Sequence, residues 1–411
     1  MALEPSDLSL SLSKIAEEVF EHCQHGAQSE GIVAIDPQHP VRACGQFYGN
    51  DVRNRGQRGL HGTAAAVGIL LSTRKGPYVD EANRLLNYVN RRMAIEQGAG
   101  VTDLSQIIDD ESNTIKQSEL LASINSLASD PSCVPALIEK IFTGQDATSG
   151  AWGFFLDEKI SSNIATCYAV LGLHDRVLPE KLQKAWKYLW DEQNQLTKRS
   201  EAFDVDAIAR RSLILYTLIV SATDNSPGPF SKKELVATIT SLWRHCQRQY
   251  EYPFEVTIEY HRGSKNHYVR IPWQIYLAHA LLRANSSYFY SIRFQQYISA
   301  LIQRAVQGGY AYSQAGPFLS TRTNHILYEF LSFASTLEPR VSVLFRAVDR
   351  LGEYWANDWV RMTSVTLIGL CGLKVSNMMN HQLLGQSSIV SNVIASVFIM
   401  LLCWLYSKGN R

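Results

Sequence analysis

Repetition constrains the fold of this chain more than any other sequence feature. Apolar helical segments begin near His61, Ser162, Ala207, Pro272, Thr323 and Thr363. Their starts recur at roughly fifty residues, or about double that where the weaker stretch 111–127 fills a gap. Internal repeats of this length are typical of stacked helical hairpins, so the sequence predicts an all-α fold.

A second class of helix alternates with the first. These stretches carry apolar residues at three- and four-residue spacing and charges on the other face, at Tyr78–Met93, Glu180–Glu192, Lys232–Arg248, Ser291–Val306 and Glu338–Trp355. Segments that are apolar nearly all round need burial on most sides, whereas the amphipathic segments need one face exposed to solvent. A closed ring of hairpins, the α/α toroid, meets both needs. An open superhelical array is the alternative. The weak strand signal in 254–260 predicts at most a small hairpin with 267–271.

The end of the chain carries a different signal. Residues 387–407 contain no formal charge over about twenty positions, and Lys408 and Arg411 follow them. Trp404 and Tyr406 stand where interfacial aromatic anchors are usual. We expect one C-terminal transmembrane helix, although the polar side chains in its first half also fit a buried helix. Such polar side chains would serve contacts between membrane helices in a homo-oligomer.

The domain prediction is a helical segment at 1–40, a toroid domain at 41–380 and a membrane anchor at 387–407. The first residues lack the basic and apolar regions of a secretion signal, so we expect the main domain to be cytosolic. The 7 cysteines are scattered and show no zinc spacing, so no metal or cofactor is expected. With 39 Lys and Arg against 38 Asp and Glu, no basic field predicts nucleic acid as a partner.

One loop resembles a known repeat. In GQDATSGAWG, the residues Gln145, Gly150 and Trp152 resemble the Q-x(n)-G-x-W signature of the squalene and terpene cyclases, and VQGGYAY from Val306 is a weaker echo. The chain is therefore similar to the superfamily that also contains the protein prenyltransferase β-subunits, whose architecture is the α/α toroid. We expect a structural role for the repeat, with Trp152 packed under the Gln145 amide and Gly150 allowing close approach.

The resemblance also implies a catalytic position. Class II cyclases of that superfamily donate a proton from the middle Asp of a D-x-D-D motif, and this chain has Asp204 and Asp206 but Ala207 in the last place. Asp206 would be the proton donor, with Asp204 beside it. The alternative is that one of them caps the helix that follows. His61 in the first turn of an apolar helix is a further acid–base candidate, or else a structural histidine. No D-x-C motif supports zinc-dependent prenylation.

Basic and aromatic residues recur near the starts of the apolar helices. We expect helix N-termini to meet at one mouth and favour an anion there. The predicted ligand-binding residues are Arg58, Arg210, Arg270, Arg322, His325, Trp273, Tyr310 and Trp359.

The combined prediction is a membrane-anchored, terpene-cyclase-like protein that handles an isoprenoid or isoprenoid diphosphate in a central cavity, with cyclisation started by protonation if it is catalytic. The alternative is a non-enzymatic sensor or adaptor, whose toroid binds an anionic, nucleotide-like small molecule or a protein and whose tail acts at the membrane. The missing last Asp favours the alternative, and the sequence leaves enzymatic activity open.

Overall fold

The computed structural model describes residues 5–25, 47–48, 60–96, 113–124, 134–199, 204–222, 229–247, 255–263, 265–306, 311–313, 316–317 and 319–337. The chain divides into two compact units, of which the first is Met1–Phe289 with Arg293–Glu338 and the second is Tyr290–Ile292 with Pro339–Arg411. The fold of the first unit is described below. The predicted segments at 338–355, 363–373 and 387–407 lie outside the described residues.

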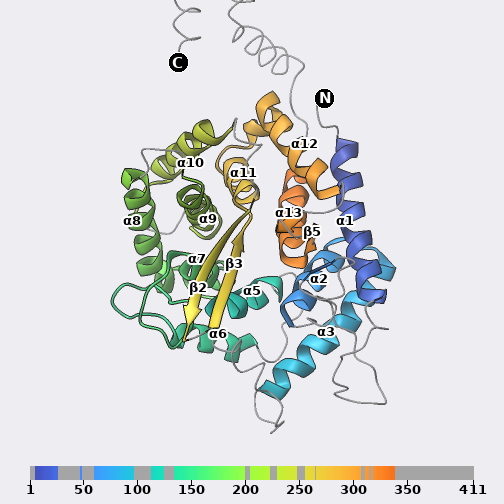
Figure 1. Cartoon of the computed structure of the whole chain (residues 1–411), viewed down its shortest axis with the longest axis horizontal. Coiled ribbons are helices and arrows are strands. Elements are labelled where there is room, and N and C mark those ends of the chain that lie inside the picture. The colour runs from blue at the N-terminus through green and yellow to red at the C-terminus, as the bar shows by residue number, and fades with distance from the viewer. Residues whose placement is uncertain are drawn as a thin grey trace, which may run out of the picture. The chain divides into compact units, whose positions relative to one another are not determined.

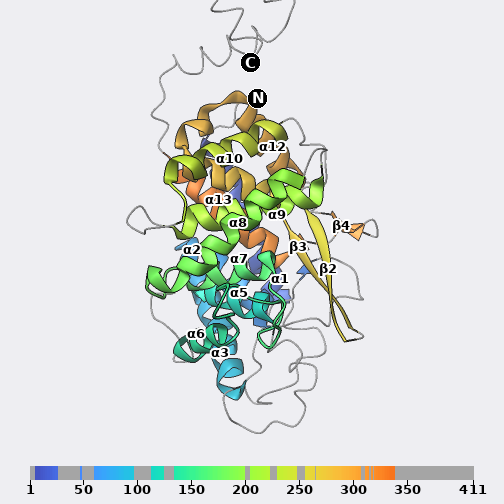
Figure 2. The ribbon, with the colours of Figure 1, turned by 90° about the vertical axis from the view of Figure 1, so that its left-hand side faces the viewer.

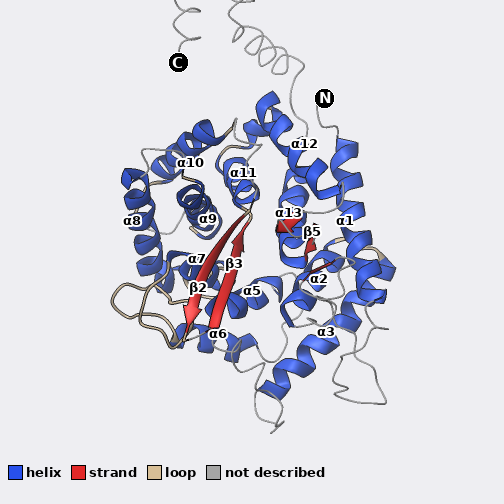
Figure 3. Ribbon diagram, in the orientation of Figure 1, coloured by secondary structure: helices blue, strands red, loops and turns tan. Residues whose placement is uncertain are grey.

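The described residues are mainly helical and contain twelve α-helices, which confirms the predicted helical class (Figure 3). Five of them match predicted apolar segments, and a sixth, α5, lies in the weaker stretch 111–127: α2 (Leu60–Ser72), α5 (Thr114–Ile124), α7 (Asn163–Leu173), α9 (Val205–Ser221), α11 (Trp273–Ala284) and α13 (Thr321–Thr336). We call these the inner helices. The other six are α1 (Pro5–His25), α3 (Gly76–Glu96), α6 (Val134–Thr143), α8 (Gln183–Arg199), α10 (Lys232–Cys246) and α12 (Ile292–Val306). Two short 3₁₀ helices, η3 (Pro179–Leu182) and η4 (Ser286–Tyr290), precede α8 and α12.

Burial separates the two classes of helix as the sequence predicts. In α7 every residue except Leu171 is buried, whereas α10 buries only one stripe of its surface, at Leu235, Ile239, Leu242, Trp243 and Cys246. The stripe repeats every three or four residues because only one face of an amphipathic helix meets the core. Both helices start at a serine cap: Ser162 accepts from the amide of Ala165, and Ser231 forms a capping box with Glu234.

The inner helices contact one another in sequence order. Contacts run from α2 to α5, α7, α9, α11 and α13, and α13 contacts α2 again, so the series closes among the described helices. In Figure 1, α9 and α11 lie side by side with α8 and α10 outside them. Helix α1 contacts both α13 and α2, so the N-terminal helical segment packs where the series closes.

Strands are few among the described residues. The predicted hairpin is present as β2 (Val256–Arg262) and β3 (Lys265–Ile271), paired antiparallel from Val256 opposite Ile271 to Arg262 opposite Lys265. Figure 2 shows it along one side of the helices, and β3 runs directly into α11. Two further antiparallel pairs are β1 (Phe47–Tyr48) with β6 (Leu319–Ser320), and β4 (Ala311–Ser313) with β5 (Gly316–Pro317).

A membrane-spanning helix was sought in the described ranges. None of their helices is both long enough and apolar enough to cross a bilayer. The predicted anchor at 387–407 was outside that search and stays a prediction.

Candidate functional site

The Gln–Gly–Trp loop joins an outer helix to the next inner helix. The Trp152 indole Nε1 donates to the carbonyl of Ile141 in the last turn of α6 at 2.7 Å, and the Gln145 amide donates to the carbonyl of Gly150 at 2.9 Å. The backbone N–H of Trp152 donates to Thr166 Oγ1 in α7 at 3.0 Å. Gly150 has a φ of +73°, and a Cβ there would clash with Lys184 Cβ. These contacts give the loop the structural role that the sequence predicts.

The β2–β3 hairpin is tied to the N-terminal ends of the inner helices. Asn113, which precedes α5, donates from Nδ2 to the hydroxyl of Tyr260 at 2.7 Å. Thr323 in the first turn of α13 donates to the Glu255 carboxylate at 2.5 Å. The Tyr260 ring stacks on Phe154, with centroids 4.0 Å apart and planes 7° apart. Packed aromatic rings and hydrogen bonds thus occupy part of the end where the sequence predicts a binding mouth.

A cavity of about 400 Å³ lies among the inner helices, and all six contribute to its wall. The lining residues of α7 and α9 come from the second half of each helix, including Tyr168 and Leu171 of α7 and Tyr216 and Val220 of α9. His174 and Asp175, directly after α7, also line it. The cavity therefore extends toward the C-terminal ends of α7 and α9, whereas α2, α11 and α13 also contribute Gly62, Tyr276 and His325 from their N-terminal halves. The mouth expected at the N-terminal ends stays a prediction.

Tyrosines form much of the wall, namely Tyr168, Tyr216, Tyr276 and Tyr328. The hydroxyls of Tyr168 and Tyr276 lie 3.3 Å apart, and the rings of Tyr216 and Tyr276 have centroids 4.9 Å apart. Burial raises the pKa of Tyr216, Tyr276 and Tyr328, so these phenols stay neutral at neutral pH. The wall offers aromatic surface and hydroxyl groups.

Charged groups in the lining are mostly acidic. Glu119, Asp175 and Glu329 supply three carboxylates among the described lining residues, and Arg283 supplies one guanidinium. The C-terminal ends of helices add partial negative charge at the same side. This excess of carboxylates over guanidinium groups disfavours a multiply charged anion in the cavity.

His279 and Arg283 lie one turn apart on α11. Arg283 Nε donates to His279 Nε2 at 3.0 Å, and its guanidinium lies 4.6 Å from the centroid of the Phe333 ring. His279 is 1% exposed. Burial, and secondarily the charge of Arg283, hold the pKa of His279 well below its usual value, so the ring is neutral.

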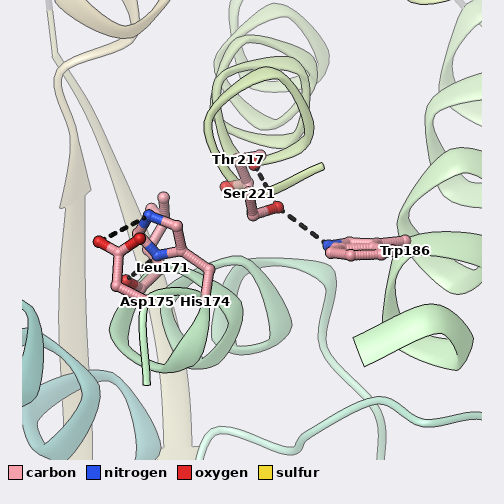
Figure 4. A network of polar contacts seen from close by, with 6 residues as sticks. All are labelled: Leu171, His174, Asp175, Trp186, Thr217 and Ser221. Carbon is pink, nitrogen blue, oxygen red and sulfur yellow. Dashed lines mark hydrogen bonds and ion pairs between the residues drawn. The ribbon is translucent and has the colours of Figure 1, made fainter. Parts of the chain in front are cut away.

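Two further histidines line the cavity (Figure 4 shows the first). His174 Nδ1 contacts the Leu171 carbonyl at 2.8 Å, and Nε2 lies 3.2 Å from an Asp175 oxygen. A carbonyl only accepts, so Nδ1 carries a proton, and the contact to Asp175 is attractive when Nε2 carries one too. His325 Nε2 lies 3.6 Å from Glu329 Oε1, and a Cβ at Gly68 of α2 would meet that nitrogen at 2.6 Å.

The second set of polar contacts in Figure 4, between α8 and α9, has a structural role. Figure 4 shows Trp186 of α8 donating from its indole Nε1 to Ser221 Oγ at the end of α9, at 2.9 Å, while Ser221 donates to the Thr217 carbonyl at 2.7 Å. Trp186 is 1% exposed. This hydrogen bond joins an outer helix to the inner helix next to it.

The predicted catalytic carboxylates lie at the start of α9. Asp204 is the N-cap, and its Oδ1 accepts from the backbone N–H groups of Asp206 and Ala207 at 3.0 and 3.3 Å. The capping alternative is therefore the observed role of Asp204. Asp206 is exposed, and neither carboxylate lines the cavity. His61 lies in α2, but its side chain is outside the described part of the structure.

Four of the predicted ligand-binding residues have described side chains, and of these only one lines the cavity. His325 lines the cavity, whereas Arg210 donates to Asn163 Oδ1 at 3.2 Å, Arg270 lies in β3, and Trp273 is fully buried at the start of α11. The remaining four have no described side chain: Arg58, Arg322, Tyr310 and Trp359.

Sequence reasoning missed most of the cavity wall. Tyr276, His279 and Arg283 share one face of α11 because they are three and four residues apart, and polar groups in a helix that is otherwise apolar all round are a signal for a buried polar site.

Within the described residues, no group of three His, Cys, Asp or Glu side chains is arranged to hold a metal ion. Comparison with known proteins gave no match to a family model, to a curated protein or to a solved structure.

Proposed function

We propose that the described helices form an α/α toroid, with the six inner helices around the cavity and the other six outside. The closed series of contacts from α2 through α13 and back to α2 supports this arrangement over an open superhelical array, because an open array leaves its first and last helices apart. The structural geometry of Gln145 and Trp152 supports it further.

The function proposed for this toroid is to bind an elongated, uncharged isoprenoid in the central cavity. The observation that carries the proposal is the cavity itself, which has a volume of about 400 Å³ and a wall rich in tyrosine rings. Its charged groups come from α5, α11, α13 and the residues directly after α7. Small-molecule sites are mostly apolar with a few polar groups, and their volumes run from about 300 to 1,000 Å³. The volume favours a farnesyl-sized chain over squalene, which is twice as long.

An isoprenoid diphosphate fits this wall less well than an uncharged isoprenoid. The lining contains three carboxylates, on Glu119, Asp175 and Glu329, and one guanidinium, on Arg283. A diphosphate would meet repulsion from the carboxylates and from the C-terminal ends of the helices. The same charges count against a nucleotide as the ligand.

Binding without turnover is favoured over cyclisation. The proton donor that the cyclase resemblance implies is Asp206, and this side chain is exposed and outside the cavity wall. A proton donor must come within hydrogen-bond reach of the atom that it protonates. The proposed role is therefore that of an isoprenoid-binding protein, with the cyclase as the second candidate.

The proposed membrane anchor at 387–407 suits this role. An isoprenoid partitions into lipid, so a cytosolic domain held at a bilayer would meet its ligand there. Assembly into a homo-oligomer through the anchor is part of the same proposal.

The test is a thermal-shift assay of the full chain with farnesol, squalene, farnesyl diphosphate and nucleotides. A ligand that binds only the folded state raises Tm, so we expect farnesol to raise it most. Products are sought by mass spectrometry in the same samples, with Asp206→Asn alongside. A cyclised product that Asp206→Asn abolishes would replace the binding proposal with the cyclase.

A matched pair of variants locates the ligand. Ala122→Phe adds a ring to the cavity wall on α5, and Ala237→Phe adds the same ring at an exposed position on α10. We expect only Ala122→Phe to abolish the shift caused by farnesol. Equal shifts in both variants, or no shift with any prenyl compound, would contradict the proposal.

A further inference from the structure

His279 is the most deeply buried ionisable group of the cavity wall. Its side chain is 1% exposed and packs among aromatic rings, with centroids 5.0 Å from Tyr216, 5.6 Å from Phe330 and 5.3 Å from Phe333. These rings come from α9 and α13, the inner helices that contact α11. The imidazole is thus held between helices and has little freedom to turn.

The contact with Arg283 fixes which imidazole nitrogen carries the proton. An arginine side chain can only donate, so the 3.0 Å contact makes His279 Nε2 the acceptor. In a neutral imidazole the proton is then on Nδ1. The lowered pKa of His279 keeps the ring in this neutral form.

The Nδ1–H group has no acceptor among the described residues, and the atom is fully buried. A buried N–H without an acceptor is costly, and most such groups in proteins are paired. His279 lines the cavity, but its Nδ1 atom is covered by neighbouring atoms, so an oxygen atom of a bound molecule reaches Nδ1 only after a small movement of the wall.

We infer that His279 Nδ1–H donates a hydrogen bond to an oxygen atom of the bound molecule, which makes the ligand an oxygen-bearing isoprenoid, an alcohol or ether in place of a plain hydrocarbon. This inference rests on the proposed function. Arg283 acts as a positioning residue, because it holds the histidine tautomer that presents the donor. The carboxylates of the lining, on Glu119, Asp175 and Glu329, disfavour an anionic oxygen such as a carboxylate or phosphate.

Three ligands with one carbon skeleton test the inference on the unmodified full chain: farnesol, farnesyl methyl ether and farnesene. The ether oxygen can only accept a hydrogen bond, and the hydrocarbon has no oxygen. One hydrogen bond to a buried donor corresponds to about five- to tenfold in Kd. We expect the alcohol and the ether to bind about five- to tenfold more tightly than farnesene.

Three substitutions of His279 then locate the donor. The side-chain nitrogen of Asn reaches the place of Nδ1, so His279→Asn keeps the donor. His279→Gln places its amide toward Arg283, and His279→Phe keeps the ring without a donor. We expect the preference for the ether over farnesene to survive in His279→Asn and to fall to about onefold in the other two.

The outcomes distinguish failure of the His279 hydrogen bond from failure of the proposed isoprenoid-binding function. Equal binding of all three ligands by the unmodified chain would overturn the role of His279 and leave the isoprenoid-binding function standing. The role of His279 is also overturned if His279→Gln and His279→Phe keep the preference. Failure of all three ligands to bind would overturn both.

Discussion

The two ends of the inner helices differ in what fills them. At the N-terminal ends, the β2–β3 hairpin and the Gln–Gly–Trp loop bring together Trp152, Phe154 and Tyr260, whose rings and hydrogen bonds leave a packed layer. Farther along, the same helices surround a cavity lined by tyrosine, histidine and carboxylate side chains. One set of helices thus carries a packed region beside the hairpin and an open space between the helices, and the connections at the N-terminal ends account for the difference.

The largest expected effect concerns the packed end. Trp152→Ala should lower the free energy of unfolding by about 3–5 kcal/mol, because it removes a fully buried indole and its hydrogen bond to Ile141. Urea denaturation measures this change. The control is Tyr268→Ala, at a side chain 59% exposed in the hairpin, which should change stability by less than about 0.5 kcal/mol. Similar losses in both variants would remove the distinction between the two ends.

The next effect concerns the cavity end and depends on pH. The pKa of His279 is lower in the folded state than its usual value of 6.5, so the unfolded chain binds more protons below that pH. The stability that His279 contributes is present above pH 6.5 and declines as the pH falls further. His279→Phe should reduce the slope of unfolding free energy between pH 7 and 5 by up to about 1.4 kcal/mol per pH unit. An unchanged slope would show that the histidine is not held neutral.

The smallest effect separates the two carboxylates at the start of α9. Asp204→Ala should cost about 1 kcal/mol, because it removes the N-cap that accepts from two backbone N–H groups. Asp206→Asn should change stability by less than about 0.5 kcal/mol and leave farnesol binding unaltered. Loss of binding in Asp206→Asn would instead assign function to the packed end.

The helices could be predicted from sequence because their patterns are local. The apolar segment from Ser162 became α7, which starts one residue later, and Lys232 begins α10 as predicted. Even the weak stretch 111–127 contains α5. The short helix α6 was missed, although its buried residues Val134, Leu137 and Ile141 follow the three- and four-residue spacing of an amphipathic helix.

The position of the site could not be predicted in the same way. The sequence reasoning placed a mouth near Arg270 and Trp273, on the general tendency of helix N-termini to bind anions. Contacts at that end, such as Asn113 to Tyr260, join residues 147 positions apart. Pairings of that range leave no local pattern. Tyr276 and His279 share one helix face because of their three-residue spacing, but spacing cannot say that the face lines a cavity.

The contact between α13 and α2 bears on how the chain reaches this state. Helix α2 ends at Ser72 and α13 begins at Thr321. The interface between them therefore joins a segment that is translated early to one that is translated much later. During translation, the apolar surface of α2 that contacts α13 stays uncovered by α13 until α13 has left the ribosome. Contacts between segments so far apart in sequence also slow folding. The interval is a period of exposure to aggregation, and premature termination before α13 would leave that surface uncovered.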